Sequence, residues 1–165
     1  KAIEVCRRKE IEIVSQDLAQ LAQDGRRFGV VTFFGVLEHL SNPLGVLKDA
    51  WQILESGGVL AALVPNIDSL TTRVLQEKCN TFDGVEHLNF WNALTIEKFV
   101  KSAGFEVRKI ETAISEIYAL NNYLHFEHPY ACPEEYPLLL GDLLPPDEIH
   151  RRNWGHHLLC YAVKK

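Results

Sequence analysis

Two short apolar runs separated by a helical pattern constrain the fold of this chain most. Phe28–Leu37 is nearly continuous in β-branched and aromatic residues, and Val59–Val64 is a second run that Pro65 stops. Runs of this kind are typical of strands buried on both faces of a parallel sheet. Each is too short to cross a bilayer, which requires about 20 residues. We therefore expect two neighbouring strands and no contact with a membrane.

The segment between these runs carries the signals of a helix. Asn42 can cap its first turn, Pro43 suits the first helical position, and Gly57 and Gly58 can end it. Between them, apolar residues recur at helical spacing: Leu44, Leu47, Ala50, Trp51 and Leu54. The sequence therefore predicts a helix that connects two parallel strands.

The same patterns continue along the chain. Further helices are predicted over Ala2–Lys9, from Asp68 or Ser69, and from a cap at Thr95 to Gly104; further strands are predicted over Ile11–Asp17, Phe105–Ile110 and His156–Val163. Alternating strands and helices predict an α/β fold with a doubly wound, Rossmann-like sheet. Right-handed crossovers would place helices on both faces of this sheet.

Residues 121–150 differ in composition from the remainder of the domain. They hold five of the seven prolines, and proline density disfavours long helices and central strands. We interpret this segment as an insertion before the last strand that could act as a lid. Residues 1–165 otherwise fit a single domain.

Charge and cysteine content exclude several classes of function. Lys and Arg total 17 against 22 Asp and Glu, for a net charge of −5, which argues against a nucleic-acid partner. The four cysteines are scattered without a C-x-x-C pair, as expected for reduced thiols in a cytoplasmic protein.

An ordered set of short motifs resembles a known family. The set comprises FGVVTFFGVLEHL, the following Asn-Pro, LESGG, VPN, HLNFW and TIEKFVKSAGFEV. This order resembles the second half of class I S-adenosylmethionine-dependent methyltransferases. The resemblance implies S-adenosylmethionine as the cofactor and an acceptor that receives a methyl group.

One part of the family pattern is absent. The family binds its cofactor with a glycine-rich turn after the first strand, but this sequence contains no G-x-G and no methionine. We therefore expect an N-terminally truncated domain, with the chain being the C-terminal part of a catalytic domain and inactive by itself.

The resemblance places two candidate catalytic residues in the turn after Phe28–Leu37. His39 lies just beyond a strand end, where ligands gather in open α/β sheets, and an imidazole can titrate near neutrality. His39 could therefore accept the acceptor's proton, or it could only pack on the following helix. Glu38 could orient His39 or bond the local backbone.

Candidate cofactor contacts follow from the same resemblance. Asp17 and the Leu18 amide match the family's adenine contacts, although Asp17 could instead cap a helix. Phe34 and Gly35 match the backbone that passes the methionine part of the cofactor, although ordinary strand packing is the alternative. A glycine permits close approach there.

Three residues are candidates for acceptor binding. Asn66 could bond the substrate or cap the next helix, and His87 could contact the acceptor or lie in a surface loop. Tyr123 could line a pocket for a planar substrate or pack within its loop. Trp91 is expected in the core.

The sequence predicts no metal site. Some related O-methyltransferases, including those of ubiquinone biosynthesis, carry Glu-x-x-Glu-His in this turn and can bind a divalent cation there. Here Gly35 occupies the first position and offers no side chain, so two ligands of the three remain.

The expected function is therefore methyl transfer to the oxygen or nitrogen of a small molecule. One alternative is a non-catalytic module that pairs with a partner subunit, because a half-sheet exposes an edge. A nucleotide-binding enzyme of another Rossmann type is a further alternative, and no residue set supports its chemistry.

Overall fold

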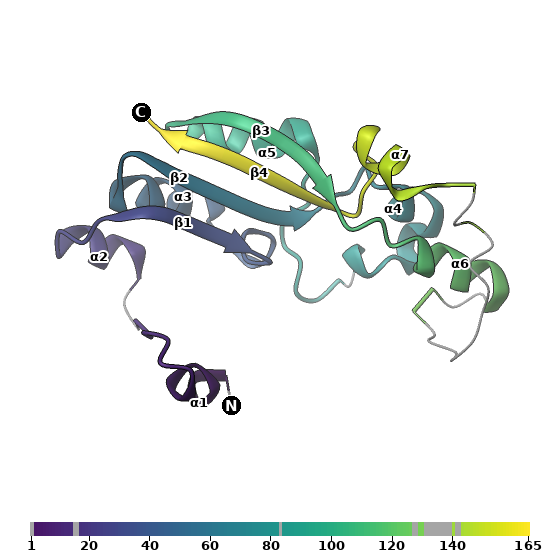
Figure 1. The fold of residues 1–165 in the computed structure, drawn as a ribbon, viewed down its shortest axis with the longest axis horizontal. Helices are drawn as coiled ribbons and strands as arrows, with labels where there is room; N and C mark the ends of the chain where they lie inside the picture. Colours follow the sequence, from purple (N-terminus) through teal and green to yellow (C-terminus); the bar gives the residue numbers. More distant parts are fainter. Residues whose placement is uncertain (1, 15–16, 83, 127–128, 131–139, 141–142) are drawn as a thin grey trace.

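The described part of the chain forms one open sheet with four strands (Figure 1). The computed structural model describes all residues except 1, 15–16, 83, 127–128, 131–139 and 141–142. The strands are β1 (Phe28–Phe34), β2 (Leu54–Pro65), β3 (Phe105–Ala113) and β4 (His157–Lys164), in the order β1-β2-β4-β3. Because β4 is antiparallel to β2 and β3, the other three strands share one direction. Their carboxyl ends therefore meet at one edge.

Helix α3 (Pro43–Ile53) connects the parallel strands β1 and β2, as the sequence predicts. The Asn42 side chain accepts a hydrogen bond from the Gly45 amide at 3.0 Å. The prediction for the helix end is wrong, because β2 begins directly after Ile53. Gly57 has a φ of +77° and lies where the β1–β2 register shifts. It therefore belongs to an irregularity in the strand pairing rather than to a helix end.

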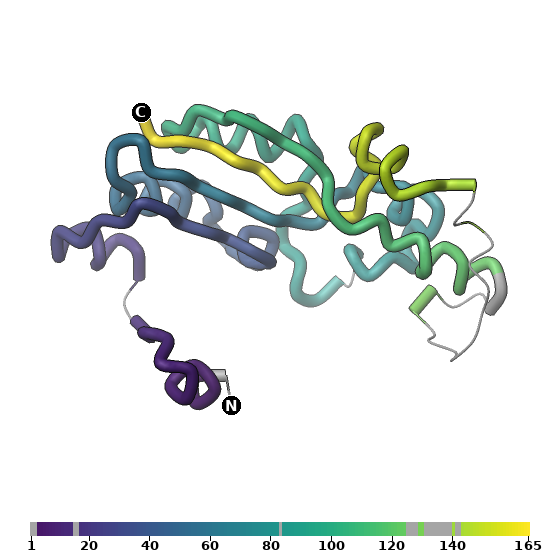
Figure 2. Tube along the Cα trace, viewed as in Figure 1, coloured from purple at the N-terminus to yellow at the C-terminus, as the bar shows by residue number. Residues whose placement is uncertain are grey.

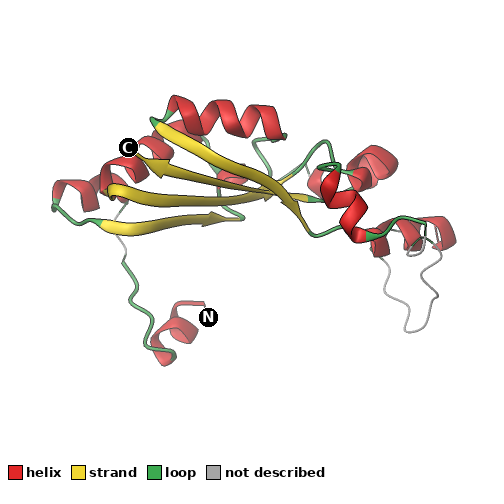
Figure 3. Cartoon of the chain, turned by 45° about the horizontal axis from the view of Figure 1, so that its top comes forward, coloured by secondary structure: helices red, strands yellow, loops and turns green. Residues whose placement is uncertain are grey.

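Helices α2 (Leu18–Gln23), α3 and α5 (Ala93–Ser102) pack on one face of the sheet (Figure 3). The core lies between them, where alternate strand residues such as Leu60, Ala62 and Leu158 meet Leu47 and Val100. Helices on both faces were predicted, but the described residues place these three on one face only. The opposite face is apolar and half-buried at five positions: Val59, Leu63, Leu159, Tyr161 and Val163.

Strand β1 is an edge strand rather than a strand buried on both faces. It pairs with β2 alone among the described strands, and the side chains of Val30 and Phe34 are 58% and 57% exposed. An apolar run predicts burial on both faces, but the three helices cover only one face of the sheet, and an edge strand has a neighbour on one side only.

The predicted strand over Ile11–Asp17 is not formed at its described residues, 11–14 and 17. Helix α1 (Ala2–Arg8) and residues 11–14 lie apart from the sheet (Figures 1 and 2). Residues 11–14 pair with no described strand, and Ile11 is 54% exposed. An alternating pattern forms a strand only where another strand supplies hydrogen-bond partners.

Capping residues define further helix ends. Ser69 caps α4 (Leu70–Leu75), as one of the two predicted positions. Helix α5 begins three residues before the predicted cap: Asn92 caps it, and Thr95 bonds back to the Asn92 amide at 2.8 Å. Gly104 follows the helix with a φ of +99°, a conformation that favours glycine.

A second, smaller core lies beyond the carboxyl edge of the sheet (Figure 2). Leu75 and Cys79 pack there against Ala119 and Leu120 of α6 (Ile117–Phe126), next to the short 3-10 helices η2 (Gln76–Lys78) and η3 (Asn80–Phe82). Helix α7 (Pro146–Arg151) follows, with Pro145 before its first turn. Much of the predicted insertion lies outside the described residues.

Two further predictions can be compared with the described residues. Cys6, Cys79 and Cys160 are free thiols, while Cys132 lies outside the described residues. None of the described helices has the length and apolarity needed to span a membrane.

Candidate functional site

The turn after β1 carries the two candidate catalytic residues at the carboxyl edge of the sheet. Gly35 adopts a φ of +65°, and its amide donates to the Leu63 carbonyl at 3.0 Å, which turns the chain away from β1. The 3-10 helix η1 (Leu37–His39) follows. Leu37 is fully buried and anchors the turn, so Glu38 and His39 have fixed positions.

A second segment, residues 85–91, docks on this turn through backbone groups. The Leu88 and Asn89 amides donate to the Glu38 carbonyl at 2.8 and 3.0 Å. The Asn89 side-chain amide donates to the Leu40 carbonyl at 2.7 Å. These bonds place His87 beside the turn. Sequence reasoning grouped Asn89 only within a motif and missed this role.

The docking places His39 against His87. Their ring centroids are 4.9 Å apart. His39 Nδ1 lies 2.9 Å from the Glu86 carbonyl, and His87 Nδ1 lies 2.8 Å from the Thr81 carbonyl. A carbonyl oxygen only accepts, so each Nδ1 donates its proton and the neutral ring keeps its lone pair on Nε2.

Glu38 places a buried carboxylate beside this pair. Its side chain is 4% exposed, and Oε1 lies 3.9 Å from His39 Nε2. Its Oε2 has no hydrogen-bond partner among the described residues. Glu38 therefore lies where it can stabilise a positive charge on His39. Its backbone carbonyl, rather than its carboxylate, carries the bonds to the neighbouring segment.

The candidate cofactor residues lie in two places. Asp17 caps α2, with its carboxylate accepting from the Gln20 amide at 2.8 Å, and Leu18 packs against the main core. The capping role that the sequence left open for Asp17 is thus present. Phe34 and Gly35 lie beside the Glu38–His39 turn, and a Cβ atom added to Gly35 would lie 3.8 Å from Glu38 Oε1.

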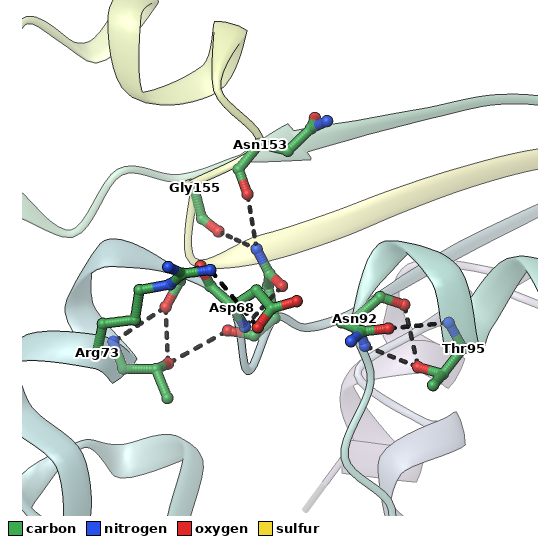
Figure 4. Close-up of polar contacts among 9 residues, drawn as sticks. Asp68, Arg73, Asn92, Thr95, Asn153 and Gly155 are labelled. Atoms are coloured by element: carbon green, nitrogen blue, oxygen red, sulfur yellow. Dashed lines mark hydrogen bonds and ion pairs between the residues drawn. The ribbon is translucent and has the colours of Figure 1, made fainter.

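Asn66 connects the ends of three elements through hydrogen bonds. Its side-chain amide donates to the Asn153 and Gly155 carbonyls at 3.1 and 2.9 Å (Figure 4). Its Oδ1 accepts from the Asp68 amide at 3.0 Å. The residue is 1% exposed, so both amide hydrogens are used inside the protein. The helix cap itself is Ser69.

Tyr123 belongs to the second core. Its side chain packs against the cluster formed by Leu75, Cys79, Ala119 and Leu120, and the Lys78 ammonium lies 4.8 Å from the ring centroid. Trp91, by contrast, is 3% exposed and packs edge-to-face on Phe99, as expected for a core residue.

Sequence reasoning missed a buried acid–histidine pair at the same edge. His156 Nδ1 lies 3.2 Å from Glu116 Oε2, with side chains 3% and 8% exposed. The approach lacks hydrogen-bond geometry, so burial dominates both groups. Burial lowers the pKa of His156 to about 4 and raises the pKa of Glu116. No sequence motif joins these residues.

Comparisons with known proteins identify the family. The family described as "Methyltransferase domain" matches residues 2–110. No curated protein sequence matches the chain.

Solved structures share the fold at low sequence identity. A Thermotoga maritima S-adenosylmethionine-dependent methyltransferase, described as a possible histamine N-methyltransferase, is 17% identical with a TM-score of 0.64. The match covers 99% of this chain and 68% of that one. The N-methyltransferase NodS of Bradyrhizobium japonicum, in complex with S-adenosyl-L-homocysteine, is 13% identical with a TM-score of 0.53; the match covers 99% and 61%. A chain of a methyltransferase activator complex from Haloferax volcanii is 15% identical with a TM-score of 0.50; the match covers 83% and 54%.

The strand–helix–strand unit with its Glu-His turn lies within the matched residues, and the solved structures support the same α/β fold. The chain therefore belongs to the methyltransferase domain family.

Proposed function

We propose that this chain takes part in S-adenosylmethionine-dependent methyl transfer to an oxygen or nitrogen atom of a small molecule. Family membership supports the reaction class, and the names of the structural neighbours support the cofactor. The net charge of −5 favours a small-molecule acceptor over a nucleic acid.

The tautomer of His39 carries the mechanistic proposal. The sulfonium cofactor activates the methyl group, so the protein chiefly aligns the acceptor and removes its proton. His39 Nδ1 donates to the Glu86 carbonyl, which leaves Nε2 to accept that proton at the carboxyl edge of β1. The His39 side chain is 37% exposed and can be reached. Glu38, 3.9 Å away, would stabilise the resulting imidazolium.

The remaining contacts are proposed from the resemblance and the geometry together. The backbone of Phe34 and Gly35 would run beside the methionine part of the cofactor, next to the Glu38 carboxylate. Asp17 and the Leu18 amide would contact the adenine. His87 lies against His39 and would contact the acceptor, while Tyr123 would do so from the second core.

The cofactor proposal is tested by titrating the intact protein with S-adenosylmethionine in a calorimeter. A saturable exothermic or endothermic signal supports it. Absence of binding at about millimolar cofactor would refute it, because a dissociation constant in that range is weak even for a metabolite.

The role of His39 is tested by His39→Ala. We expect kcat to fall by about 100-fold or more, the usual contribution of a general base, with cofactor affinity unchanged. Methylation is measured with a chelator present. His150→Gln, on α7 and bonded to Thr112, is the matched control and should retain activity. Equal kcat in His39→Ala and the parent protein would remove His39 from the mechanism.

The open edge of β1 favours a second candidate function, a non-catalytic module that pairs with a partner subunit. Val30 and Phe34 are exposed on this edge strand, and one structural neighbour is part of an activator complex. Copurification of a methyltransferase-like subunit with an inactive chain would support this function. Turnover by the purified protein alone would reject it.

A further inference from the structure

We propose that Glu38, His39 and His87 form a binding site for one first-row transition-metal ion of the zinc type. One ligand atom from each residue lies within 4.8 Å of the others. Two imidazoles and one carboxylate are a ligand set that Zn²⁺ accepts, with a fourth position left for water. Mg²⁺ and Ca²⁺ prefer oxygen ligands, so the two imidazoles disfavour them.

Both histidines are oriented as metal ligands usually are. A ligating imidazole commonly donates its other N–H to a backbone carbonyl, which fixes the tautomer and the ring orientation. His39 does so toward Glu86, and His87 does so toward Thr81. These carbonyls come from the loop before His87 and from η3, so two segments fix the two rings independently.

Glu38 supplies the second observation. Its Oε2 is buried and without a hydrogen-bond partner among the described residues, although its side chain is only 4% exposed. An unpaired buried carboxylate oxygen is costly, and a coordinated cation would satisfy it. While they are neutral, neither His39 nor His87 supplies the positive charge that would pair with this oxygen.

The geometry requires a small closure. Ligand atoms about 2.1 Å from a tetrahedral ion lie about 3.4 Å apart, while these atoms are separated by up to 4.8 Å. The closure would keep the bond from His39 Nδ1 to the Glu86 carbonyl and tilt the His39 ring, whose side chain is 37% exposed, toward Glu38. The buried Glu38 and the docked segment of residues 85–91 would supply the fixed side of the site.

The sequence predicted no metal site because its motif includes the possible ligands of a single turn. Gly35 removes one ligand from that turn, but the tertiary structure adds His87 from another segment. The backbone bonds from Leu88 and Asn89 to Glu38 make this replacement possible. The ligand set therefore spans two segments rather than one motif.

The test is a titration of the purified, metal-free protein with Zn²⁺ by calorimetry and with Co²⁺ by visible absorption. We expect one ion per chain and a Co²⁺ spectrum typical of nitrogen and oxygen ligands. Glu38→Gln, His39→Ala and His87→Ala should each weaken binding by at least about tenfold, since even outer partners of a metal cost that much. His150→Gln is the control and should bind as the parent protein does.

Circular dichroism shows which variants are folded. If Glu38→Gln does not fold, His39→Ala and His87→Ala decide the outcome. Absence of saturable Zn²⁺ binding, or unchanged binding in His87→Ala, would overturn the site. The titration contains neither cofactor nor acceptor, so its result is independent of the proposed methyl transfer. A bound ion would occupy the His39 lone pair, which is why the activity assay above includes a chelator.

Discussion

Individual buried polar residues connect the strand ends at the carboxyl edge. Asn66 follows β2, and its side-chain amide donates to the carbonyls of Asn153 and Gly155 before β4. Its backbone amide donates to the His156 carbonyl at 2.8 Å. His156 in turn lies beside Glu116 after β3. These contacts place residues from three strand ends in one polar layer, so substitutions there should affect stability before they affect chemistry.

Asn66→Ala should lower the free energy of unfolding by about 2–4 kcal/mol, because two carbonyls and one amide lose their buried partner. Denaturant unfolding measures this loss. Gln52→Ala, at an exposed position of α3, should change stability by less than about 0.5 kcal/mol. A loss in Asn66→Ala no larger than in this control would contradict the assignment.

His156 should make the protein less stable below neutral pH. Its pKa is about 4 in the folded state, below the unfolded value of about 6.5. Above pH 6.5 both states leave it neutral, whereas below that only the unfolded state binds the proton. Stability therefore falls from about pH 6.5 toward 4, by about 2 kcal/mol at pH 5.

Neighbouring groups modify this dependence and define its control. Glu116 acts in the opposite direction because its folded-state pKa is raised, while burial also lowers the pKa of His157. His156→Gln should remove only the His156 contribution, so its thermal stability should depend less steeply on pH. Identical pH profiles for the two proteins would exclude His156 as the cause.

At the scale of elements, caps determine where helices begin more than apolar periodicity does. The apolar residues Ile96, Phe99 and Val100 predict α5, but Asn92 and Thr95 fix its first turn through reciprocal bonds. The segment before this cap also carries Asn89 and His87. A precise start of α5 therefore helps to position the segment that docks on η1.

Asn92→Ala should cost about 1 kcal/mol of stability, because the Thr95 amide loses its side-chain acceptor. Asn92→Ser keeps an oxygen that can cap and should remain close to the parent protein. The two variants are compared by denaturant unfolding. Equal losses in both would show that the cap contributes nothing.

At the scale of the whole molecule, β1 forms an open edge of the sheet among the described strands. In the described part of the chain it has a partner on one side only, and it carries the exposed side chains of Val30 and Phe34. Exposed apolar edges promote pairing with other chains, and natural proteins often protect them with charge. This edge carries no lysine, since β1 reads FGVVTFF.

The chain comprising residues 1–165 should therefore associate as its concentration rises, and Val30→Lys should reduce that association. Sedimentation velocity at several concentrations measures the effect. Ile3→Lys in α1 is the matched control, because Ile3 is 56% exposed but lies off the sheet. A monomer at every concentration, or an equal effect of Ile3→Lys, would contradict the prediction.

The sequence by itself determined the βαβ unit, most helix positions and the Glu38–His39 turn. These depend on local signals: apolar periodicity, capping residues and a short ordered motif. It also identified His87, but without its neighbour. It misassigned Gly57, residues 11–14 and the burial of β1, because those depend on which strands are adjacent.

Only the tertiary structure decided what the polar residues face. Asn66 donates to two carbonyls before β4, and one carboxylate oxygen of Asp17 accepts from the first turn of α2. His39, His87 and Glu38 converge because backbone bonds join two segments that are distant in sequence. Hydrogen bonds and metal ligands are short-range and directional, so spacing along the chain cannot specify them when the partners lie on different segments.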